Sequence, residues 1–350
     1  MHKGVATVAQ LDGFDEIIDV RSPAEFEEDA IPGAINCPVL DNEERARVGT
    51  IYKQVSPFEA RRLGGALVAA NLARHLLDKF QDRPKKWRPL VYCWRGGQRS
   101  GSFVSWMRMI GWDAHQLDGG YKAWRREMVQ ELDTLSERFD WRVVCGATGS
   151  GKTRLLEALA AAGAQVLDLE GLARHKGSVL GTIPGTPQPS QKRFESETWA
   201  ILRRLDPARP VFVEAESKKI GRTHVPDALI GAMRASPCVA VDATRDARLE
   251  FLLRDYAYLG DDVDDLKFRI SCLKSLQSNE TLERWSALAD ARDFRTLFGE
   301  FMDQHYDPLY HRSQNRNYVR FGEARHYDCD DLGEAGVRVL AGRILADEAA

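Results

Sequence analysis

The stretch that most constrains the fold of this chain is GATGSGKT, which runs from Gly146 to Thr153. It matches G-x-x-x-x-G-K-[ST] at every fixed position, with an apolar strand pattern before it and a helical pattern after it. The glycines permit backbone angles that turn successive N–H groups inward around phosphate oxygens, and the helix N-terminus adds its positive end. We therefore predict a phosphate-binding loop on a mostly parallel α/β sheet.

The side chains of this loop have separate expected tasks. Lys152 neutralises the charge of the terminal phosphate, and Thr153 is a candidate ligand for Mg²⁺. Such a loop binds a diphosphate or polyphosphate, and its presence alone does not imply ATP hydrolysis. The residues expected to bind the diphosphate are Gly146, Thr148, Gly149, Ser150, Gly151, Lys152 and Thr153.

Acidic residues follow two other strand patterns of the same region. VFVEAES ends an apolar strand in Glu214 and Glu216, whose alternation puts both side chains on one face, as expected of Walker-B-like residues. Asp168 and Glu170 follow the strand pattern of AQVLDLE, at the place where small-molecule kinases hold an acceptor. A solvated surface would explain Asp168 equally well, so its role stays open at this point.

A second loop of special composition lies in LVYCWRGGQRSGS, where a short apolar strand ends at Cys93. Two glycines and two arginines follow the cysteine, and a helical pattern begins directly after them. Backbone N–H groups, a helix N-terminus and nearby arginines all lower the pKa of a thiol, and the same cradle would bind a tetrahedral oxyanion. We expect a catalytic Cys93 within a loop made of Arg95, Gly96, Gly97, Gln98, Arg99 and Ser100.

The spacing from Cys93 to Arg99 is Cys-x5-Arg, which is also typical of protein tyrosine phosphatases. Tyr92 stands where those enzymes usually have a histidine. One alternative is therefore a phosphatase fused to a small-molecule kinase-like P-loop domain, which would release phosphate from aryl phosphates and bind no RNA. A second alternative is a non-enzymatic, nucleotide-regulated sulfur-carrier module, in which Cys93 would be dispensable.

The alternation of strand and helix patterns divides the 350 residues into two α/β domains. The first is expected at 1–130 and the second at 141–350, with a polar linker at 131–140. From about 248 onward the pattern of the second domain is helical. The fold class is therefore α/β, with a C-terminal helical extension.

Composition excludes several other classes of protein. The net charge is −3, so nucleic-acid binding would depend on local basic patches. No apolar run approaches the roughly 18 residues of a membrane span, so we expect no membrane partner. The six cysteines include no CxxC pair, which argues against zinc and against a disulfide framework. We expect a cytoplasmic protein with no tightly bound cofactor.

The first 130 residues resemble a rhodanese domain in the blocks IIDVRSPAEF, IPGAINCP and LDGGYKAW. Two departures stand out. Asp29-Ala30 replaces the usual Gly-His before Ile31, and the cysteine loop is one residue longer than in ordinary sulfurtransferase rhodaneses. The resemblance therefore implies a rhodanese fold, while the wider loop would suit a ligand larger than thiosulfate.

A rhodanese domain joined to a P-loop domain resembles the tRNA 2-selenouridine synthase family. The blocks GTIYKQVSPFEARRLG, CWRGGQRSGS, GATGSGKT, GTPQPSQKRFE and VEAESKKIG carry the resemblance, which covers nearly the whole chain. It implies that the wobble 2-thiouridine of a tRNA anticodon exchanges sulfur for selenium from selenophosphate. It also implies an S-geranyl intermediate made from geranyl diphosphate. In that chemistry Cys93 would carry selenium as a perselenide, or the Arg95/Arg99 cradle would hold selenophosphate.

Contacts to tRNA are expected in both domains, at basic clusters with interleaved aromatic residues. The candidates are Arg61/Arg62, 83–88, Lys192/Arg193, Lys218/Lys219 and 312–320. Trp87 and Tyr318 would stack on bases. The geranyl group needs an apolar channel, which we expect beside the Gly- and Pro-rich loop at 175–196.

Overall fold

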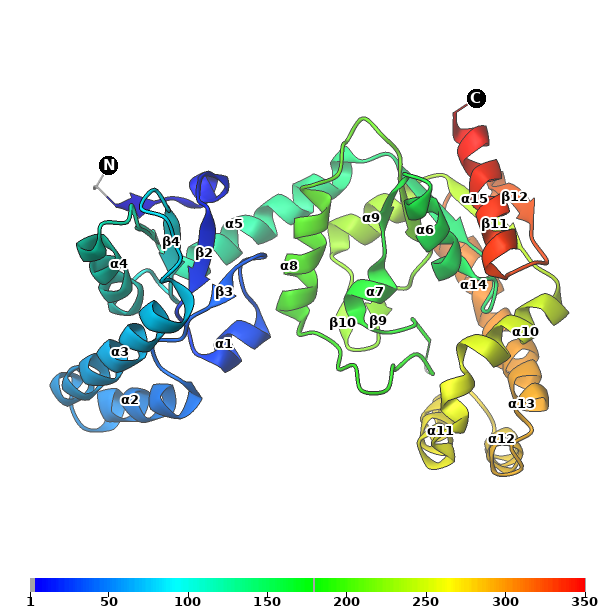
Figure 1. Ribbon diagram of the computed structural model, residues 1–350. Coiled ribbons are helices and arrows are strands. Elements are labelled where there is room, and N and C mark those ends of the chain that lie inside the picture. Colours follow the sequence, from blue (N-terminus) through cyan, green and yellow to red (C-terminus); the bar gives the residue numbers. More distant parts are fainter. Residues whose placement is uncertain (1–3, 179, 350) are drawn as a thin grey trace. The chain divides into compact units, whose positions relative to one another are not determined.

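The computed structural model describes residues 4–178 and 180–349, and the chain forms two compact units (Figure 1). The first unit holds the residues up to Glu131 together with Glu195–Ala200, and the second holds Leu132–Phe194 and Ile201–Ala350. Each contains a five-stranded sheet in which every strand pair is parallel. The predicted α/β class is therefore confirmed. Within the described residues, no helix has the length and apolar character that spanning a membrane requires.

The first unit has the strand order β1-β5-β4-β2-β3. Its strands are β1 (Val5–Ala6), β2 (Glu16–Asp19), β3 (Ile35–Asn36), β4 (Pro89–Tyr92) and β5 (His115–Leu117). Its helices are η1 (Val8–Gly13), α1 (Pro23–Glu28), α2 (Asn42–Gln54), α3 (Pro57–Lys79), α4 (Gln98–Ile110) and most of α5 (Gly120–Leu135). Local sequence sets several ends: a Ser22/Glu25 capping box and Pro23 start α1, and Gly111 in a left-handed conformation ends α4.

The second unit has the strand order β12-β11-β6-β8-β7, with a separate antiparallel pair β9-β10. Its strands are β6 (Trp141–Cys145), β7 (Gln165–Leu167), β8 (Val211–Glu214), β9 (Lys219–Ile220), β10 (Thr223–His224), β11 (Cys238–Asp242) and β12 (Arg325–Asp328). Its α-helices are α6 (Lys152–Ala161), α7 (Leu169–Ala173), α8 (Gln191–Leu202, partly in the first unit), α9 (Asp227–Ala235), α10 (Arg245–Asp255), α11 (Val263–Ser271), α12 (Asn279–Asp290), α13 (Phe294–Phe301), α14 (Asp307–Asn317) and α15 (Glu334–Glu348). Short 3₁₀ turns are η2 (Ser136–Arg138), η3 (Ala257–Gly260), η4 (Cys272–Ser275) and η6 (Phe321–Glu323), and η5 (Met302–Tyr306) is a π-helical turn.

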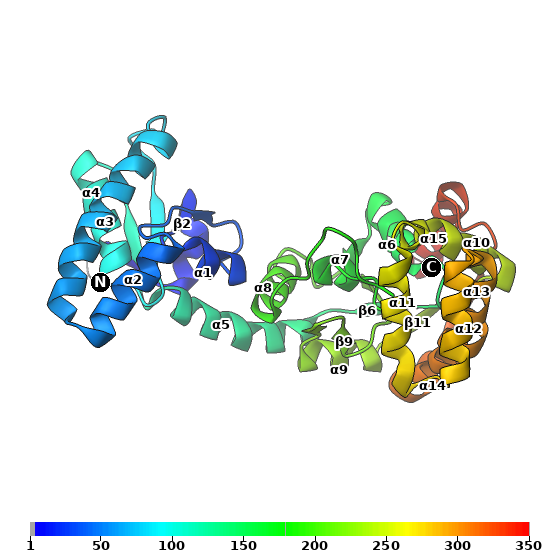
Figure 2. The ribbon, with the colours of Figure 1, turned by 90° about the horizontal axis from the view of Figure 1, so that it is seen from below.

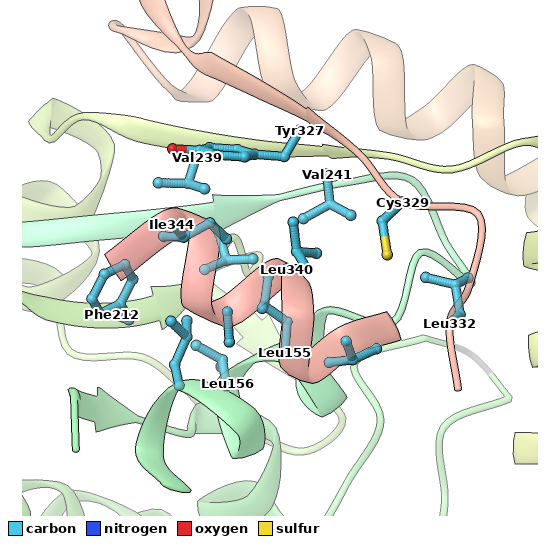
Figure 3. Close-up of a cluster of buried hydrophobic side chains, with 14 of the residues drawn as sticks. Leu155, Leu156, Phe212, Val239, Val241, Tyr327, Cys329, Leu332, Leu340 and Ile344 are labelled. Carbon is cyan, nitrogen blue, oxygen red and sulfur yellow. The ribbon is translucent and has the colours of Figure 1, made fainter. Parts of the chain in front are cut away.

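The core under the phosphate loop joins helices α6 and α15 to one face of the second sheet. Figure 3 shows Leu155 and Leu156 of α6 facing Leu340 and Ile344 of α15, beside Val241 of β11. All five side chains are buried, and burying each one contributes about 1.5–3 kcal/mol. The helix that starts at the phosphate loop is thereby held against the sheet.

A second core lies among helices α10 to α13, which Figure 2 shows grouped together. Trp285 of α12 is fully buried and packs edge-on against Phe301 of α13, with ring centroids 4.7 Å apart. The expected helical region after about 248 is present but is interrupted by β12, which the sequence did not indicate. β12 pairs only with β11 at the sheet edge, and its Arg-His-Tyr-Asp sequence has one buried side chain, so it lacks the apolar run of a central strand.

The expected linker at 131–140 is also different in the structure. Helix α5 continues to Leu135 and is followed at once by the turn η2, so most of this stretch is helical. Met128, Leu132 and Leu135 are buried at spacings of four and three residues, which places them on one helical face. The polar residues between them occupy the exposed face and gave the stretch its linker-like composition.

Candidate functional site

Cys93 follows β4 directly, and its thiol is held within the loop that the sequence indicated. Its Sγ accepts hydrogen bonds from the Gly97 N–H and the Ser100 Oγ–H, both at 3.2 Å. Burial would raise the pKa of the thiol, but these hydrogen bonds and the charge of Arg99 outweigh burial and lower the pKa below its usual value. The loop therefore favours a thiolate at Cys93.

The turn LDGG, at 117–120, packs against the cysteine loop, and the contact requires a glycine on each side. Gly120 has φ +58°, and a Cβ on it would lie 2.3 Å from the carbonyl oxygen of Cys93. Gly96 has φ +64°, and a Cβ on it would lie 2.6 Å from the carbonyl oxygen of Leu117. The Tyr121 N–H also donates to the Cys93 carbonyl at 2.9 Å. Close backbone contact thus fixes the shape of the cysteine loop.

The two arginines of the loop have different surroundings. Arg99 is largely buried, and its Nη1 donates to Glu25 Oε2 at 2.9 Å. Arg95 is exposed, as are Gly97 and Gln98. The Cys-x5-Arg spacing therefore does not leave Arg99 free to hold a phosphate as the phosphatase alternative requires.

Gln116 of β5 is a supporting residue that the sequence analysis missed. Its Nε2 donates to Ser100 Oγ at 2.8 Å and to the Gly97 carbonyl at 2.9 Å. Because Ser100 Oγ accepts from Gln116, its own proton is left to donate, and the two acceptors within reach are the Cys93 sulfur at 3.2 Å and the Gly97 carbonyl at 3.3 Å. No local sequence signal could have identified Gln116, since it lies on a different strand.

Replacing Ser100 by alanine is expected to raise the pKa of Cys93, because it removes a hydrogen bond that stabilises the thiolate. The thiolate fraction at neutral pH then falls, and the pH profile of iodoacetamide labelling shifts to higher pH. Mass spectrometry of the peptide that contains Cys93 measures this profile. Cys37 is the internal reference, since burial raises its pKa to about 11. An unchanged Cys93 profile would contradict the role given to Ser100.

The phosphate loop joins β6 to α6, as predicted. Gly149 and Gly151 have φ of +85° and +73°, and a Cβ on Gly146 would lie 2.3 Å from Ser150 Oγ. Lys152 Nζ donates to the Gly146 carbonyl at 2.8 Å and so lies across the mouth of the loop. The positive-φ glycines turn the chain into the shape that surrounds phosphate oxygens.

Carboxylates from two strand ends meet the loop in a cavity of about 610 Å³. Thr153 Oγ1 donates to Glu170 Oε2 at 3.0 Å, and the Glu170 N–H donates to Glu214 Oε1 at 2.8 Å. Glu214 is fully buried, and its Oε2 has no hydrogen-bond partner among the described residues. Glu216 lines the same cavity. Burial, and then the charges of neighbouring carboxylates, raise the pKa of Glu214 and Glu216 well above the usual range.

Asp168 also lines this cavity, but its carboxylate has a structural task. Its side chain caps α7 by accepting from the Gly171 N–H at 2.7 Å. Burial raises its pKa despite this hydrogen bond. The acceptor-site role predicted for Asp168 stays a prediction.

Replacing Glu214 by glutamine is expected to stabilise the ligand-free protein above neutral pH. Folding raises the pKa of the Glu214 carboxyl well above 4.5, which is its value in the unfolded chain. The contribution of Glu214 to the free energy of unfolding therefore falls as the pH rises above 4.5. The variant should melt higher than wild type near pH 8, by about 2–4 °C per 1 kcal/mol, and the gap should close near pH 5. Calorimetry across this range measures it, with exposed Glu280→Gln as the control. A pH-independent gap would contradict the assignment.

Arg248 of α10 is a second residue that the sequence did not indicate. Its Nε donates to the Thr148 carbonyl at 2.9 Å, and its other nitrogens form a fork with the Asp307 carboxylate at 2.6 and 3.1 Å. Asp307 begins α14, so two helices far along the chain brace the phosphate loop. Arg248 is thus a positioning residue, found only through tertiary contacts.

Two of the predicted RNA contacts are wrong. Trp87 is buried and packs between Phe80 and Trp112, with ring centroids 5.1 Å from each. Tyr318 is buried as well, and its hydroxyl donates to the Glu216 carbonyl at 2.9 Å. Aromatic residues among basic ones suggested stacking on bases, but in both places the ring faces the protein interior.

Comparisons with known proteins agree with this architecture. A family model described as "tRNA 2-selenouridine synthase AAA domain" matches residues 139–269, and a rhodanese-like domain model matches residues 6–127. A tRNA 2-selenouridine synthase of Nitrosomonas europaea is 39% identical over 244 residues, covering 69% of this chain and 63% of that protein. The tRNA 2-selenouridine synthase of Alcanivorax borkumensis is 33% identical over 326 residues, covering 84% and 88%. The one from Sulfurovum is 32% identical, covering 87% and 90%. The chain thus spans slightly under two thirds of the first relative and most of the other two.

Proposed function

The chain belongs to the tRNA 2-selenouridine synthase family, and we propose that it exchanges the sulfur of 2-thiouridine in tRNA for selenium. Selenophosphate is the proposed selenium donor, and geranyl diphosphate activates the sulfur that leaves. The observation that best supports this reaction is that one chain contains both a cysteine sulfur held by N–H and O–H donors, which lower its pKa, and a phosphate loop with buried carboxylates. One suits the chalcogen exchange and the other suits the loss of a diphosphate.

The phosphate loop would serve the first half-reaction. Sulfide is a poor leaving group, so the thiocarbonyl sulfur must first become a thioether. The sulfur forms a bond to C1 of the geranyl group as the bond from C1 to the diphosphate breaks, and the N3 proton of the uridine is released. Lys152 and the inward N–H groups of the loop stabilise the charge that develops on the leaving diphosphate.

The family of P-loop folds implies Mg²⁺ at such a site, and the donors present suit it. Within the described residues no three acidic, histidine or cysteine side chains form a ready metal cage. Mg²⁺ needs no such cage, because it usually binds one or two carboxylates together with substrate phosphates. Thr153 and Glu170 would hold it, and the unpartnered Glu214 Oε2 would face its water shell. When bound, Mg²⁺ would neutralise diphosphate charge.

The cysteine loop would serve the second half-reaction. The selenium of selenophosphate forms a bond to C2 of the uridine as the bond from C2 to sulfur breaks, and geranylthiol leaves. Water then cleaves the selenium–phosphorus bond, which releases phosphate and leaves 2-selenouridine. We assign direct participation to the Cys93 thiolate, with the exposed Arg95 and the N–H groups of the loop facing the phosphate of the donor. Arg99 acts through its charge on the sulfur and through its bond to Glu25.

The tip of the α2–α3 hairpin is the proposed RNA contact of the first unit. Tyr52 and Phe58 are 57% and 64% exposed there, which leaves two aromatic faces available to unstacked bases. Lys53, Arg61 and Arg62 are exposed on the same two helices. Among the residues that the structure describes, Arg62 is the only one of these three with an ion-pair partner, Glu59 at 2.6 Å. Exposed aromatic rings beside cations are typical of single-stranded RNA binding.

Replacing Arg61 and Arg62 together by alanine is expected to weaken tRNA binding and to make it less sensitive to salt. Each lost phosphate contact lowers the slope of log K against log salt by about 0.7–0.9, so the slope should fall by roughly 1.5. Filter binding of unmodified tRNA at several salt concentrations measures this. Arg74→Ala, exposed farther along α3, is the control. An unchanged slope would exclude the hairpin tip as an RNA contact.

Mass spectrometry of tRNA nucleosides tests the proposed function itself. Cells that carry the gene and receive selenium should contain 2-selenouridine in tRNA, and cells without the gene should not. Equal nucleoside profiles in the two strains would defeat the proposal. Phosphate release from aryl phosphates by the purified protein, without any effect on tRNA, would support the phosphatase alternative instead.

A further inference from the structure

A groove of about 1060 Å³ continues from the phosphate-loop cavity of the second unit. It lies between α6, the end of α10 and the start of α15, and both cavities share Arg154, Lys176, Ile183 and Phe251. The groove walls are mainly apolar: Ala158, Ala161, Ala162, Phe251, Leu332 and Val337. The proposed reaction steps at the phosphate loop and at Cys93 do not involve this groove.

The charged residues around the groove neutralise one another. Arg154 pairs with Glu157 at 3.0 Å and lies 3.6 Å from Asp255, and Lys176 pairs with Asp255 at 2.6 Å. Arg338 pairs with Glu334 one helical turn away. Arg254 lies with its guanidinium 5.8 Å from the centre of the Phe251 ring. Most of the basic side chains here already pair with carboxylates, which disfavours binding of a polyphosphate. The apolar walls favour binding of a hydrocarbon chain.

Helix α6 connects the two sites along one face. Lys152 and Thr153 stand at its start, in the anion site, and Arg154, Ala158 and Ala161 follow at helical spacing along the groove. From Arg154 to Ala162 this path measures about 12 Å at 1.5 Å per residue. An anion site that opens onto an apolar groove matches a molecule with an anionic head and a hydrocarbon chain.

We propose that this groove binds the prenyl chain of the alkyl donor, whose diphosphate occupies the phosphate loop. The inference rests on the proposed function and adds the place of the chain and the residues that limit its length. Small side chains at Ala158 and Ala161 leave the groove open, so a large side chain there would shorten the chain that fits. The groove also borders Ile183, in the loop at 175–196 beside which the sequence analysis expected the apolar channel.

An Ala161→Trp variant tests this, with Ala160→Trp as a matched control. Both alanines are exposed on α6, so neither change should affect folding. Of the two, only Ala161 lines the groove. Calorimetric titration of the purified full chain would use geranyl diphosphate, dimethylallyl diphosphate, inorganic pyrophosphate and ADP. We expect Ala161→Trp to weaken geranyl diphosphate about tenfold, the effect of displacing roughly two methylene groups from an apolar site. Pyrophosphate binding and the Ala160→Trp variant should match wild type.

The possible results distinguish a failure of the groove proposal from a failure of the proposed function. Unchanged geranyl diphosphate binding in Ala161→Trp, or an equal loss for pyrophosphate, would overturn the inference. A selective loss of ADP binding would also overturn it, and would make the groove a nucleoside site. If wild type binds geranyl diphosphate but transfers no geranyl group to tRNA, the proposed function fails while the groove is still judged by the titrations.

Discussion

A Lys152→Ala variant is expected to lose S-geranyl-2-thiouridine formation while it keeps the wild-type fold. Lys152 Nζ donates to the Gly146 carbonyl, and its charge opposes the rise in pKa of the buried Glu170 and Glu216. Without Lys152 these carboxyls can take up protons, so the fold is retained. The leaving diphosphate, by contrast, would lose the loop cation that is proposed to neutralise its charge as the bond to geranyl breaks. Removing one such stabilising group costs about 10²–10³ in rate. Selenation should fall in parallel, because the proposed exchange consumes the geranylated nucleoside.

Single-turnover assays with 2-thiouridine tRNA and labelled geranyl diphosphate measure this loss. Lys267→Ala is the matched control, since Lys267 belongs to the same unit and lies on the surface, paired with Asp290. Supplying tRNA that already carries S-geranyl-2-thiouridine should restore selenation by the Lys152 variant. Normal geranylation with lost selenation would reverse the tasks assigned to the two loops.

A Cys93→Ala variant is expected to show the opposite pattern. It should geranylate tRNA at the wild-type rate and produce no 2-selenouridine, so that the geranylated nucleoside accumulates. Cys93 Sγ is the centre of the hydrogen bonds from Gly97 and Ser100, and an alanine leaves that cradle without its nucleophile. Nucleoside mass spectrometry after incubation with both co-substrates shows which product forms.

Cys37→Ala is the control for this variant. Cys37 is buried in the same unit, and burial raises its pKa to about 11, so it is a protonated thiol at neutral pH. Its replacement should change stability slightly and leave both products intact. If Cys93→Ala still makes 2-selenouridine at a normal rate, the thiolate has no part in the exchange and the cradle binds selenophosphate alone.

Much of the fold was predictable because its signals are local. The glycines of the phosphate loop and the apolar strands that lead into the two loops depend on neighbouring residues, and they formed as expected. β12 was missed because an edge strand has one partner and one buried side chain. The helical stretch at 132–138 was mistaken for a linker because its exposed face is polar.

The sequence by itself determined that this chain contains a phosphate loop and a cysteine loop, each on a parallel sheet. Backbone conformations that only glycine adopts easily, set between a strand and a helix, require no distant partner. Tertiary structure decided how the loops are supported. Arg99 pairs with Glu25, Arg248 braces Thr148, and Glu214 meets Glu170, each across at least 44 positions of the chain. The tertiary structure also determines that Trp87 and Tyr318 are buried and that a groove lies beside α6. These features depend on contacts between residues that are distant along the chain and come together when the sheets and helices pack. No local sequence pattern specifies such contacts.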